Sequence, residues 1–90
     1  MRKLKYTPQF KKDVKKIQNN QKKTHLLNKT LDLLKATGTL PKEYNPHPLK
    51  GKYQGHIECH IEGDFLLIWI DEKSDVIKLI RLGSHSELFE

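Results

Sequence analysis

The sequence contains a single cysteine, Cys59, among 90 residues. A lone cysteine cannot form a disulfide within the chain, so nothing in the sequence points to an oxidising compartment. Long apolar runs are also absent: the longest, at positions 65–70, has six residues, whereas a membrane-spanning helix needs roughly 20. No apolar segment of signal-peptide length follows the basic N-terminus. We therefore expect a soluble cytoplasmic protein without a membrane partner.

The sequence also lacks the short motifs that hold cofactors. It has no glycine-rich phosphate loop, nucleophile elbow or dinucleotide fingerprint, so we expect no cofactor. His56 and His60 have the spacing of a zinc pair on a helix, but this segment is predicted to be a strand, where they would lie roughly 13 Å apart. Cys59 would point to the opposite face from His60. We therefore expect no metal ion.

Acidic residues are scarce in the first half of the chain. Residues 1–45 hold twelve Lys and Arg against three Asp and Glu, whereas residues 46–90 hold five against eight, for a formal net charge of +6. Four of the 5 histidines lie in the second half. The positive surplus favours a polyanionic partner. A basic half joined to a half rich in His and carboxylates suggests an electrostatic binding surface attached to a reactive site.

Hydrophobic periodicity predicts an α+β fold in a single domain over residues 1–90. Leu4 and Tyr6 alternate with lysines in a short half-buried strand, after which Thr7-Pro8 begins a helix. A second amphipathic helix is predicted over about 23–37, with Gly38 as its C-cap, so that the two helices form a hairpin. A long loop follows over 38–55.

Three strands are predicted after this loop, over 56–61, 64–70 and 76–82. The turns between them, at 62–63 and 71–74, are too short for parallel crossovers, so the sheet is expected to be an antiparallel meander. Ser84 and Glu87 have the spacing of a capping box for a terminal helical turn. The predicted order is β-α-α-β-β-β with a short C-terminal turn.

Alternation places Glu58 and His60 on the same face of the strand 56–61, and a two-residue turn brings Asp64 close to them. Imidazole and carboxylate groups within hydrogen-bonding reach are the usual equipment for general acid–base catalysis, because histidine titrates near neutrality. A polar pair on a solvated sheet face would show the same alternation. The spacing alone leaves both interpretations open.

Two more histidines lie where the local sequence restricts the backbone. His47 stands between Pro46 and Pro48, although stiffening of the loop would by itself explain the prolines. His85 lies inside the capping box, where the amides of a helix start can also bind a phosphate. The alternative is that Ser84 caps the turn and His85 is merely exposed.

The basic face of the first helix is a candidate RNA-binding surface, although a solvated face would look the same. Its members are Lys11, Lys12, Lys15 and Lys16. Together with the histidines, Arg81 and Phe89 of the second half, these lysines favour RNA as the polyanion. RNA offers bases for stacking and a 2′-hydroxyl group that can be activated.

Three segments carry a combined motif: HPLKG at 47–51, CHIEGDF at 59–65 and RLGSHSELF at 81–89. At this spacing they resemble the YafQ-like branch of the RelE/ParE toxin superfamily, which are type II toxins whose enzymatic members cleave mRNA. The resemblance covers essentially the whole chain. It implies a RelE-like small ribonuclease fold, in which an N-terminal strand and a helical hairpin pack on an antiparallel β-sheet.

The resemblance also implies roles for individual residues. Catalytic roles fall on His47, Glu58, His60, Asp64, Arg81, His85 and Phe89. Phe65 stands where many members have Trp, so base stacking is expected to survive there while any indole hydrogen bond is lost. We expect His85 to be the acid, and His60 with Asp64 the base and its orienting group, or the reverse. Arg81 and Lys50 would stabilise the additional phosphate charge.

The expected function is thus that of an endoribonuclease toxin that cleaves mRNA during translation, through the 2′-hydroxyl group, and so inhibits growth. The resemblance implies a cognate antitoxin, encoded next to the toxin. An acidic segment of the antitoxin is expected to bind to the basic half of this chain. The ribosome is a further expected partner, and operator DNA would be bound only through the antitoxin. ParE-like members share the fold, inhibit DNA gyrase and generally lack these histidines. A non-catalytic module that binds gyrase or RNA is therefore the alternative.

Overall fold

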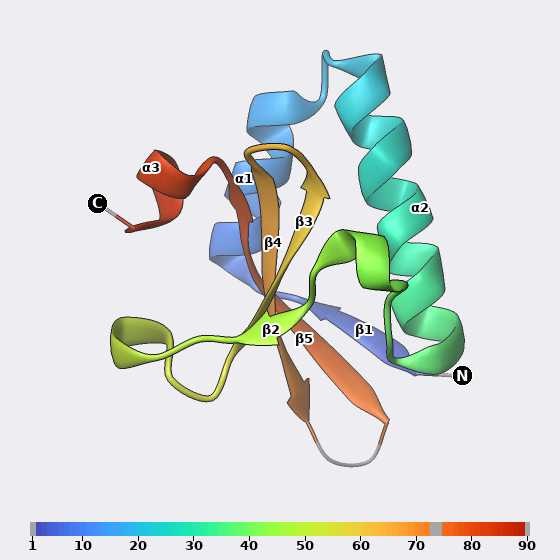
Figure 1. Ribbon diagram of the computed structural model, residues 1–90. Coiled ribbons are helices and arrows are strands. Elements are labelled where there is room, and N and C mark those ends of the chain that lie inside the picture. Colours follow the sequence, from blue (N-terminus) through green and yellow to red (C-terminus); the bar gives the residue numbers. More distant parts are fainter. Residues whose placement is uncertain (1, 73–74, 90) are drawn as a thin grey trace.

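The structure is a computed structural model that describes residues 2–72 and 75–89. Its elements are β1 (Lys3–Tyr6), α1 (Pro8–Ile17), α2 (Gln21–Thr37), β2 (His47–Pro48), β3 (Ile57–Glu62), β4 (Phe65–Glu72), β5 (Val76–Gly83) and α3 (His85–Phe89), with 3-10 turns at Lys42–Tyr44 and Gly51–Tyr53. The strands form one sheet in the order β1-β5-β4-β3-β2 (Figure 1). The predicted α+β class and the helical hairpin packed on the sheet are confirmed.

Capping residues set the ends of the two long helices. The Thr7 side chain accepts a hydrogen bond from the amide of Phe10 at 3.2 Å, as the Thr-Pro start predicts. Asn20 accepts one from the amide of Lys23 at 3.0 Å, so α2 begins at Gln21, two residues earlier than predicted. Gly38 ends α2 with a φ of 77°, in the left-handed region that favours glycine.

The antiparallel meander β3-β4-β5 is confirmed, and β1 joins it by pairing with β5 in parallel. The β3-β4 turn lies one residue later than predicted, because Glu62 pairs with Phe65 and leaves Gly63 and Asp64 in the turn. Gly63 has a φ of 50°, which glycine adopts without steric cost. In the predicted turn over 71–74, Asp71 and Glu72 belong to β4 instead, and positions 73 and 74 lie outside the described residues.

The segment predicted to be a loop over 38–55 contains a short strand. β2 pairs with β3 in antiparallel register, which places His47 opposite Glu58 and Pro48 opposite Ile57. A two-residue strand has no hydrophobic alternation of its own, so periodicity could not reveal it. The pairing fixes the position of His47 on the sheet.

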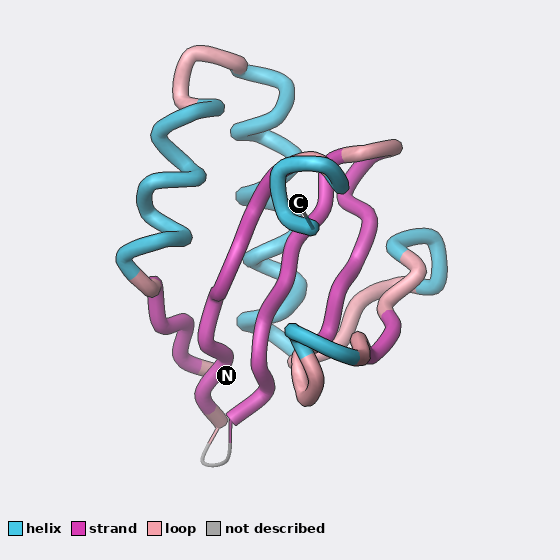
Figure 2. The backbone as a smooth tube through the Cα atoms, turned by 90° about the vertical axis from the view of Figure 1, so that its left-hand side faces the viewer, coloured by secondary structure: helices cyan, strands magenta, loops and turns pink. Residues whose placement is uncertain are grey.

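Apolar side chains pack on both faces of the sheet. The larger core lies under α1 and α2 and includes Phe10, Leu27, Leu31, Leu34, Leu67, Trp69 and Leu79. A smaller cluster of Tyr53, Leu66, Ile68 and Leu88 lies on the opposite face, which we call the site face. Figure 2 shows α3 over one end of this face. No helix in the described part of the chain is long and apolar enough to cross a membrane.

Candidate active site

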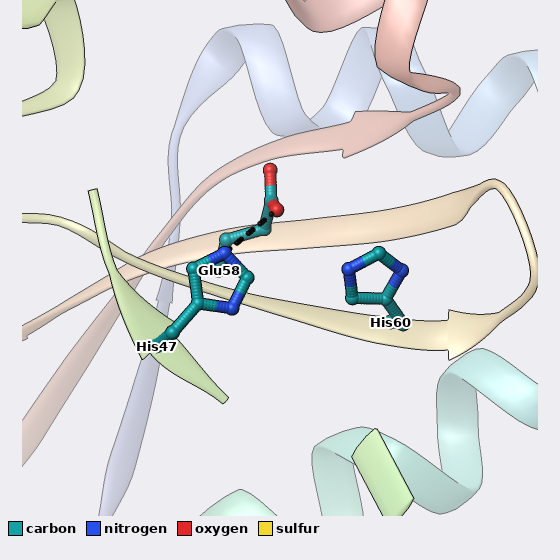
Figure 3. Close-up of side chains that lie close together, drawn as sticks. All are labelled: His47, Glu58 and His60. Carbon is teal, nitrogen blue, oxygen red and sulfur yellow. Dashed lines mark ion pairs between the residues drawn. The ribbon is translucent and has the colours of Figure 1, made fainter. Parts of the chain in front are cut away.

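His47 and Glu58 form an ion pair at the edge of the site face (Figure 3). The His47 Nε2 lies 3.2 Å from Glu58 Oε1, and the His47 Nδ1 lies 2.7 Å from the backbone oxygen of Asn45. Both ring nitrogens therefore face oxygen atoms, so the orientation of the imidazole is fixed from two sides. The segment around His47 therefore does more than stiffen the loop, because it also holds the imidazole against Glu58.

Glu58 is almost fully buried, with 5% of its surface exposed. Its Oε2 has no hydrogen-bond partner among the described residues. A buried carboxylate oxygen without a donor is costly, because charge must be solvated or paired. The second oxygen of Glu58 is therefore free to accept a proton or to bind a cation.

His60 lies two residues further along β3 on the same face, as the alternation predicts. Its Nδ1 is 3.2 Å from the backbone oxygen of Gly63, and its ring centroid is 6.0 Å from that of His47. A proton on Nδ1 would be donated to this carbonyl group, which leaves a lone pair on Nε2. The position of Gly63 therefore favours the tautomer that a general base requires.

His47, Glu58 and His60 each offer a ligand atom, and these three atoms lie within 4.8 Å of one another. This set differs from the His56 and His60 pair considered in the sequence, because the Nδ1 of His56 instead faces the backbone oxygen of Gln54 at 3.2 Å. Cys59 lies in the larger core, where burial, and secondly the charge of Glu58, raise the pKa of its thiol to about 12. Cys59 is therefore neither a ligand nor a nucleophile near neutral pH.

Asp64 holds the start of α3. Its Oδ1 accepts a hydrogen bond from the backbone amide of His85 at 2.8 Å. We expected Asp64 to orient the imidazole of His60, but the structure gives His60 the carbonyl group of Gly63 as its partner. The shift of the turn by one residue explains the difference, because it takes Asp64 out of β4. Asp64 therefore orients the backbone of His85.

The predicted capping box of α3 is present. The Ser84 amide donates to Glu87 Oε1 at 2.8 Å, and the Glu87 amide donates to Ser84 Oγ at 3.3 Å. The bond from the Ser84 amide, and secondly the Ser84 hydroxyl group, lower the pKa of the Glu87 carboxyl group, and the charge of Lys16 lowers it further. The last turn of α1 therefore lies near α3.

Phe89 packs beside His85 rather than in a core. The two ring centroids are 4.8 Å apart, and 38% of Phe89 is exposed. Tyr53 contacts the other side of Phe89 with its ring at 5.6 Å. The neighbouring Leu88 is buried in the smaller cluster and anchors the helix. The ring of Phe89 is thus held next to His85 with one part open to solvent.

Arg81 lies in the same cross-strand row as Glu58. Glu58 is opposite Ile68, which is in turn opposite Arg81. In the next row His60 is opposite Leu66, which is opposite Gly83, two residues before His85. Because neighbouring strands lie about 4.8 Å apart, the backbones of β3 and β5 are about 10 Å apart in each row. His60 and Glu58 on β3 and Arg81 on β5 thus lie on either side of β4.

This arrangement can be compared with known proteins. Over residues 2–90 the chain matches the family described as "Bacterial toxin of type II toxin-antitoxin system, YafQ". The chain belongs to the YafQ family. It is 36% identical over 90 residues to the mRNA interferase toxin YafQ of Escherichia coli K12, covering 98% of this chain and 96% of that protein. The family resemblance inferred from the sequence is confirmed.

Solved structures of the family share the fold. The crystal structure of the E. coli DinJ-YafQ complex contains a chain that matches with a TM-score of 0.83 and 33% identity, covering 100% of both chains. A metal-bound toxin from Helicobacter pylori matches with a TM-score of 0.86 and 38% identity, over 99% of this chain and 100% of that one.

One residue predicted to bind RNA is not on the site face of this YafQ family member. Phe65 is 5% exposed and belongs to the larger core, with the Lys23 ammonium over its ring at 5.4 Å from the centroid. As the first residue of β4 it points to the same side as Leu67. No face of Phe65 is open to a nucleobase, so the prediction of stacking there is wrong.

The five lysines predicted to contact RNA are exposed: Lys11, Lys12, Lys15, Lys16 and Lys50. Two residues near the site were missed. Asp13 is buried and accepts hydrogen bonds from Arg81, and the hydroxyl group of Tyr53 lies near Arg81 and helps to raise its pKa, after the larger effect of Asp13. The signal for Asp13 was available, because its spacing of three from Phe10 places it on the apolar stripe of α1.

Proposed function

We propose that this member of the YafQ family is an endoribonuclease that cleaves mRNA by acid–base catalysis through the ribose 2′-hydroxyl group. The observation that carries the proposal is that His60 lies on the site face with its Nδ1 at a backbone carbonyl group, while α3, whose His85 amide is held by Asp64, lies over one end of the same face (Figure 2). The name of the E. coli relative, an mRNA interferase toxin, supports the substrate class.

The reaction follows from these positions. His60 Nε2 removes the proton of the 2′-hydroxyl group, and the 2′-oxygen attacks the adjacent phosphorus. The bond from phosphorus to the 5′-oxygen breaks, and His85 donates a proton to the departing oxygen. The products are a 2′,3′-cyclic phosphate and a 5′-hydroxyl end. Arg81, together with Lys50, stabilises the charge that develops on the phosphate.

The experiment compares cleavage of an end-labelled mRNA, free and bound to ribosomes, by the purified protein and by His85→Ala. Loss of one acid–base group should lower the rate roughly 10²–10⁴-fold. His25→Ala is the matched control, because His25 is exposed on α2 and should leave the rate unchanged. Unchanged cleavage by His85→Ala would remove the assignment, and a wild type that cleaves neither substrate would remove the proposed function.

The proposed cellular substrate is mRNA during translation. The basic half of the chain suits a large RNA surface such as the ribosome, because neutralising phosphates supplies sequence-independent affinity. Faster cleavage of ribosome-bound than of free mRNA is the expected result. Growth arrest with intact transcripts and altered DNA topology would instead favour a gyrase inhibitor.

The proposed partner is an acidic antitoxin, by analogy with the E. coli YafQ that forms a complex with DinJ. Tyr6 is 47% exposed and lines a groove of about 240 Å³ between α1 and α2, whose other members include Phe10, Leu27, Leu31 and, as its charged residue, Lys11. An acidic segment with an apolar side chain would fit this groove. Operator DNA would then be bound through the antitoxin.

The antitoxin proposal is tested with the product of the neighbouring small reading frame. Co-expression should restore growth, and the two proteins should co-purify. Lys11→Glu should weaken the complex more than Lys42→Glu, which makes the same charge change on an exposed residue outside the groove. Absence of both rescue and co-purification would contradict the partner, and equal effects of the two variants would contradict the groove.

A second candidate function is binding of a transition-metal ion at His47, Glu58 and His60. The observation that favours it is the unpaired buried Oε2 of Glu58 beside two imidazoles, and the H. pylori toxin is described as metal-bound. A metal ion would occupy the lone pair of His60 that our mechanism uses. Added Zn²⁺ or Cu²⁺ should therefore inhibit cleavage and EDTA should not. Inhibition by EDTA would contradict metal-independent catalysis.

A further inference from the structure

The edge of β5 is only partly covered by β1. β1 ends at Tyr6, whose partner is Leu79, whereas β5 continues to Gly83. Beyond Leu79 the outer edge of β5 would expose backbone groups that need hydrogen-bond partners. Beyond the end of β1, the side chains of the α1 cap and of α1 itself supply hydrogen-bond partners to the backbone of β5. Thr7 Oγ1 donates to the carbonyl oxygen of Leu79 at 2.8 Å, and Asp13 Oδ2 accepts from the amide of Leu82 at 2.9 Å.

The same carboxylate also holds Arg81. The Arg81 Nε donates to Asp13 Oδ2 at 2.9 Å, and its Nη2 lies 3.4 Å from Asp13 Oδ1. Gln9 Nε2 donates to Oδ1 at 3.2 Å. Asp13 is 2% exposed. A carboxylate this deeply buried is stable when several donors satisfy both of its oxygens, as they do here.

The contact between Asp13 and Arg81 leaves one edge of the Arg81 guanidinium group free of that carboxylate. Asp13 takes the Nε–H and one N–H of Nη2, which leaves the two N–H groups of Nη1 and the second of Nη2. Even with the Tyr53 hydroxyl group near Arg81, donors remain for another acceptor. The Arg81 side chain is 18% exposed, which shows that the group is partly open to solvent despite its buried partner. Two bonds to a fixed carboxylate determine the plane of the guanidinium group and therefore the direction of the free donors.

We propose that Asp13 is the positioning residue of the active site: it fixes the plane of Arg81 so that the free donors face the phosphate during cleavage. The inference rests on the proposed function. Asp13 itself touches no reacting atom, and it acts through Arg81. An arginine without this carboxylate would have to be ordered at each reaction cycle, and misplacement of a positioning group lowers the rate rather than the affinity.

The charge of the Asp13–Arg81 pair also affects how the site binds RNA. Asp13 neutralises much of the charge of Arg81, so Arg81 serves as a set of directed donors while the exposed lysines supply the attraction for RNA. Replacement of Asp13 should therefore not weaken RNA binding, because the protein becomes more positive. This expectation separates a positioning role from a binding role.

The test is steady-state cleavage by Asp13→Asn. We expect kcat to fall roughly 10- to 100-fold, with KM within about threefold of the wild-type value. Asp32→Asn is the matched control, because it makes the same charge change on an exposed residue of α2 and should leave both constants unchanged. A rise in KM with kcat unchanged, or equal behaviour of the two variants, would overturn the proposal.

Two further measurements separate positioning from loss of folding. In the Arg81→Ala background, Asp13→Asn should cause no additional loss of kcat, because the residue through which it acts is gone. An additional loss equal to that in the wild-type background would overturn the proposal. Asp13→Glu, which retains the charge on a longer side chain, should recover part of kcat.

The state of Arg81 can also be measured without any substrate. In NMR spectra of the wild type, the Nε–H signal of Arg81 should exchange slowly with water, because it is bonded to a buried carboxylate. In Asp13→Asn it should exchange faster, while backbone signals of β4 remain in place. Fast exchange in the wild type would overturn the positioning of Arg81. Absence of cleavage by a wild type with a slow Nε–H would instead remove the proposed function alone.

Discussion

Asp13 and Glu58 are the two carboxylates that are buried in the described part of the chain, and each holds a basic side chain of the site. Asp13 pairs with Arg81, and Glu58 pairs with His47. Burying a carboxylate is costly unless it is paired. These two buried carboxylates therefore mark residues of the proposed mechanism.

Phe89 gives the first prediction at this scale. Phe89→Ala should weaken cleavage by roughly 1–3 kcal/mol in transition-state energy, the usual value of a lost base–aromatic stack. Phe89→Tyr should retain most of the activity, because it keeps an aromatic face next to His85. Single-turnover rates measure the effect, and thermal unfolding provides the control.

Thermal unfolding of Phe89→Ala distinguishes a stacking role from a structural one, because Phe89 is partly exposed. Removal of a buried aromatic side chain would cost about 3–5 kcal/mol of folding free energy, whereas Phe89 is 38% exposed. A melting temperature that falls together with the cleavage rate would show that Phe89 is structural and would contradict a stacking role.

Some residues could be assigned from the sequence and others could not. The shared face of Glu58 and His60 follows from strand alternation, and the capping box of Ser84 and Glu87 follows from their spacing. Phe65 was misplaced, because its role was taken from the family resemblance, whereas strand alternation puts it on the face of Leu67, in the larger core. Asp13 was missed, because a single acidic residue among exposed lysines resembles an ordinary solvated position.

At the scale of elements, three short segments position the site, and none has a periodicity of its own. β2 presents His47 to Glu58, the turn at Gly63 orients His60, and α3 carries His85 and Phe89. The long elements were predictable because apolar residues recur on one face of each. Pairing with β3 determines β2, and a local pattern does not contain that information. The turn and α3 were indicated by their local sequence, but the atoms that they hold in place were not.

The helix α3 gives a prediction on pH. The pKa of Glu87 is lowered in the folded protein, so its ionised form stabilises the capping box. This stabilisation is present above the ordinary pKa of 4.5 and is lost as the pH falls through the lower folded value. The Ser84 amide signal in NMR should therefore shift on acidification in that range, as α3 frays.

The matched variants are Glu87→Gln and Glu43→Gln. Glu87→Gln should abolish the acid-induced shift of the Ser84 amide, since the titrating group is gone. Glu43 is exposed on a 3-10 turn, and its replacement should leave the shift intact. Identical titration curves in the wild type and Glu87→Gln would contradict the role of the capping box.

At the scale of the whole molecule, the positive charge and the candidate catalytic residues lie on different parts of one fold. Most of the positive surplus is on the helical hairpin, and four of the 5 histidines are on and around the sheet. Asp13 of α1 accepts a hydrogen bond from the amide of Leu82, two residues before Ser84, so the basic helix α1 lies near the start of α3. RNA bound along α1 would thus be directed toward His85.

This arrangement predicts the salt dependence of RNA binding. For single strands, the logarithm of the binding constant falls with the logarithm of salt concentration by about 0.7 per phosphate contact. The double replacement Lys15→Ala and Lys16→Ala should reduce this slope by up to about 1.4. Lys42→Ala is the control and should leave the slope unchanged. A slope unaffected by the double replacement would exclude these lysines from the RNA path.

The central claim is cleavage through the 2′-hydroxyl group, and substitution of that group tests it most directly. Two mRNA substrates are compared that differ in a single 2′-deoxy nucleotide on the 5′ side of the cleaved bond, and the ends of the products are identified. We expect the ribose substrate to yield a 2′,3′-cyclic phosphate and the deoxy substrate to resist cleavage at that bond. Cleavage of the deoxy substrate at the same bond and at an equal rate would contradict the mechanism.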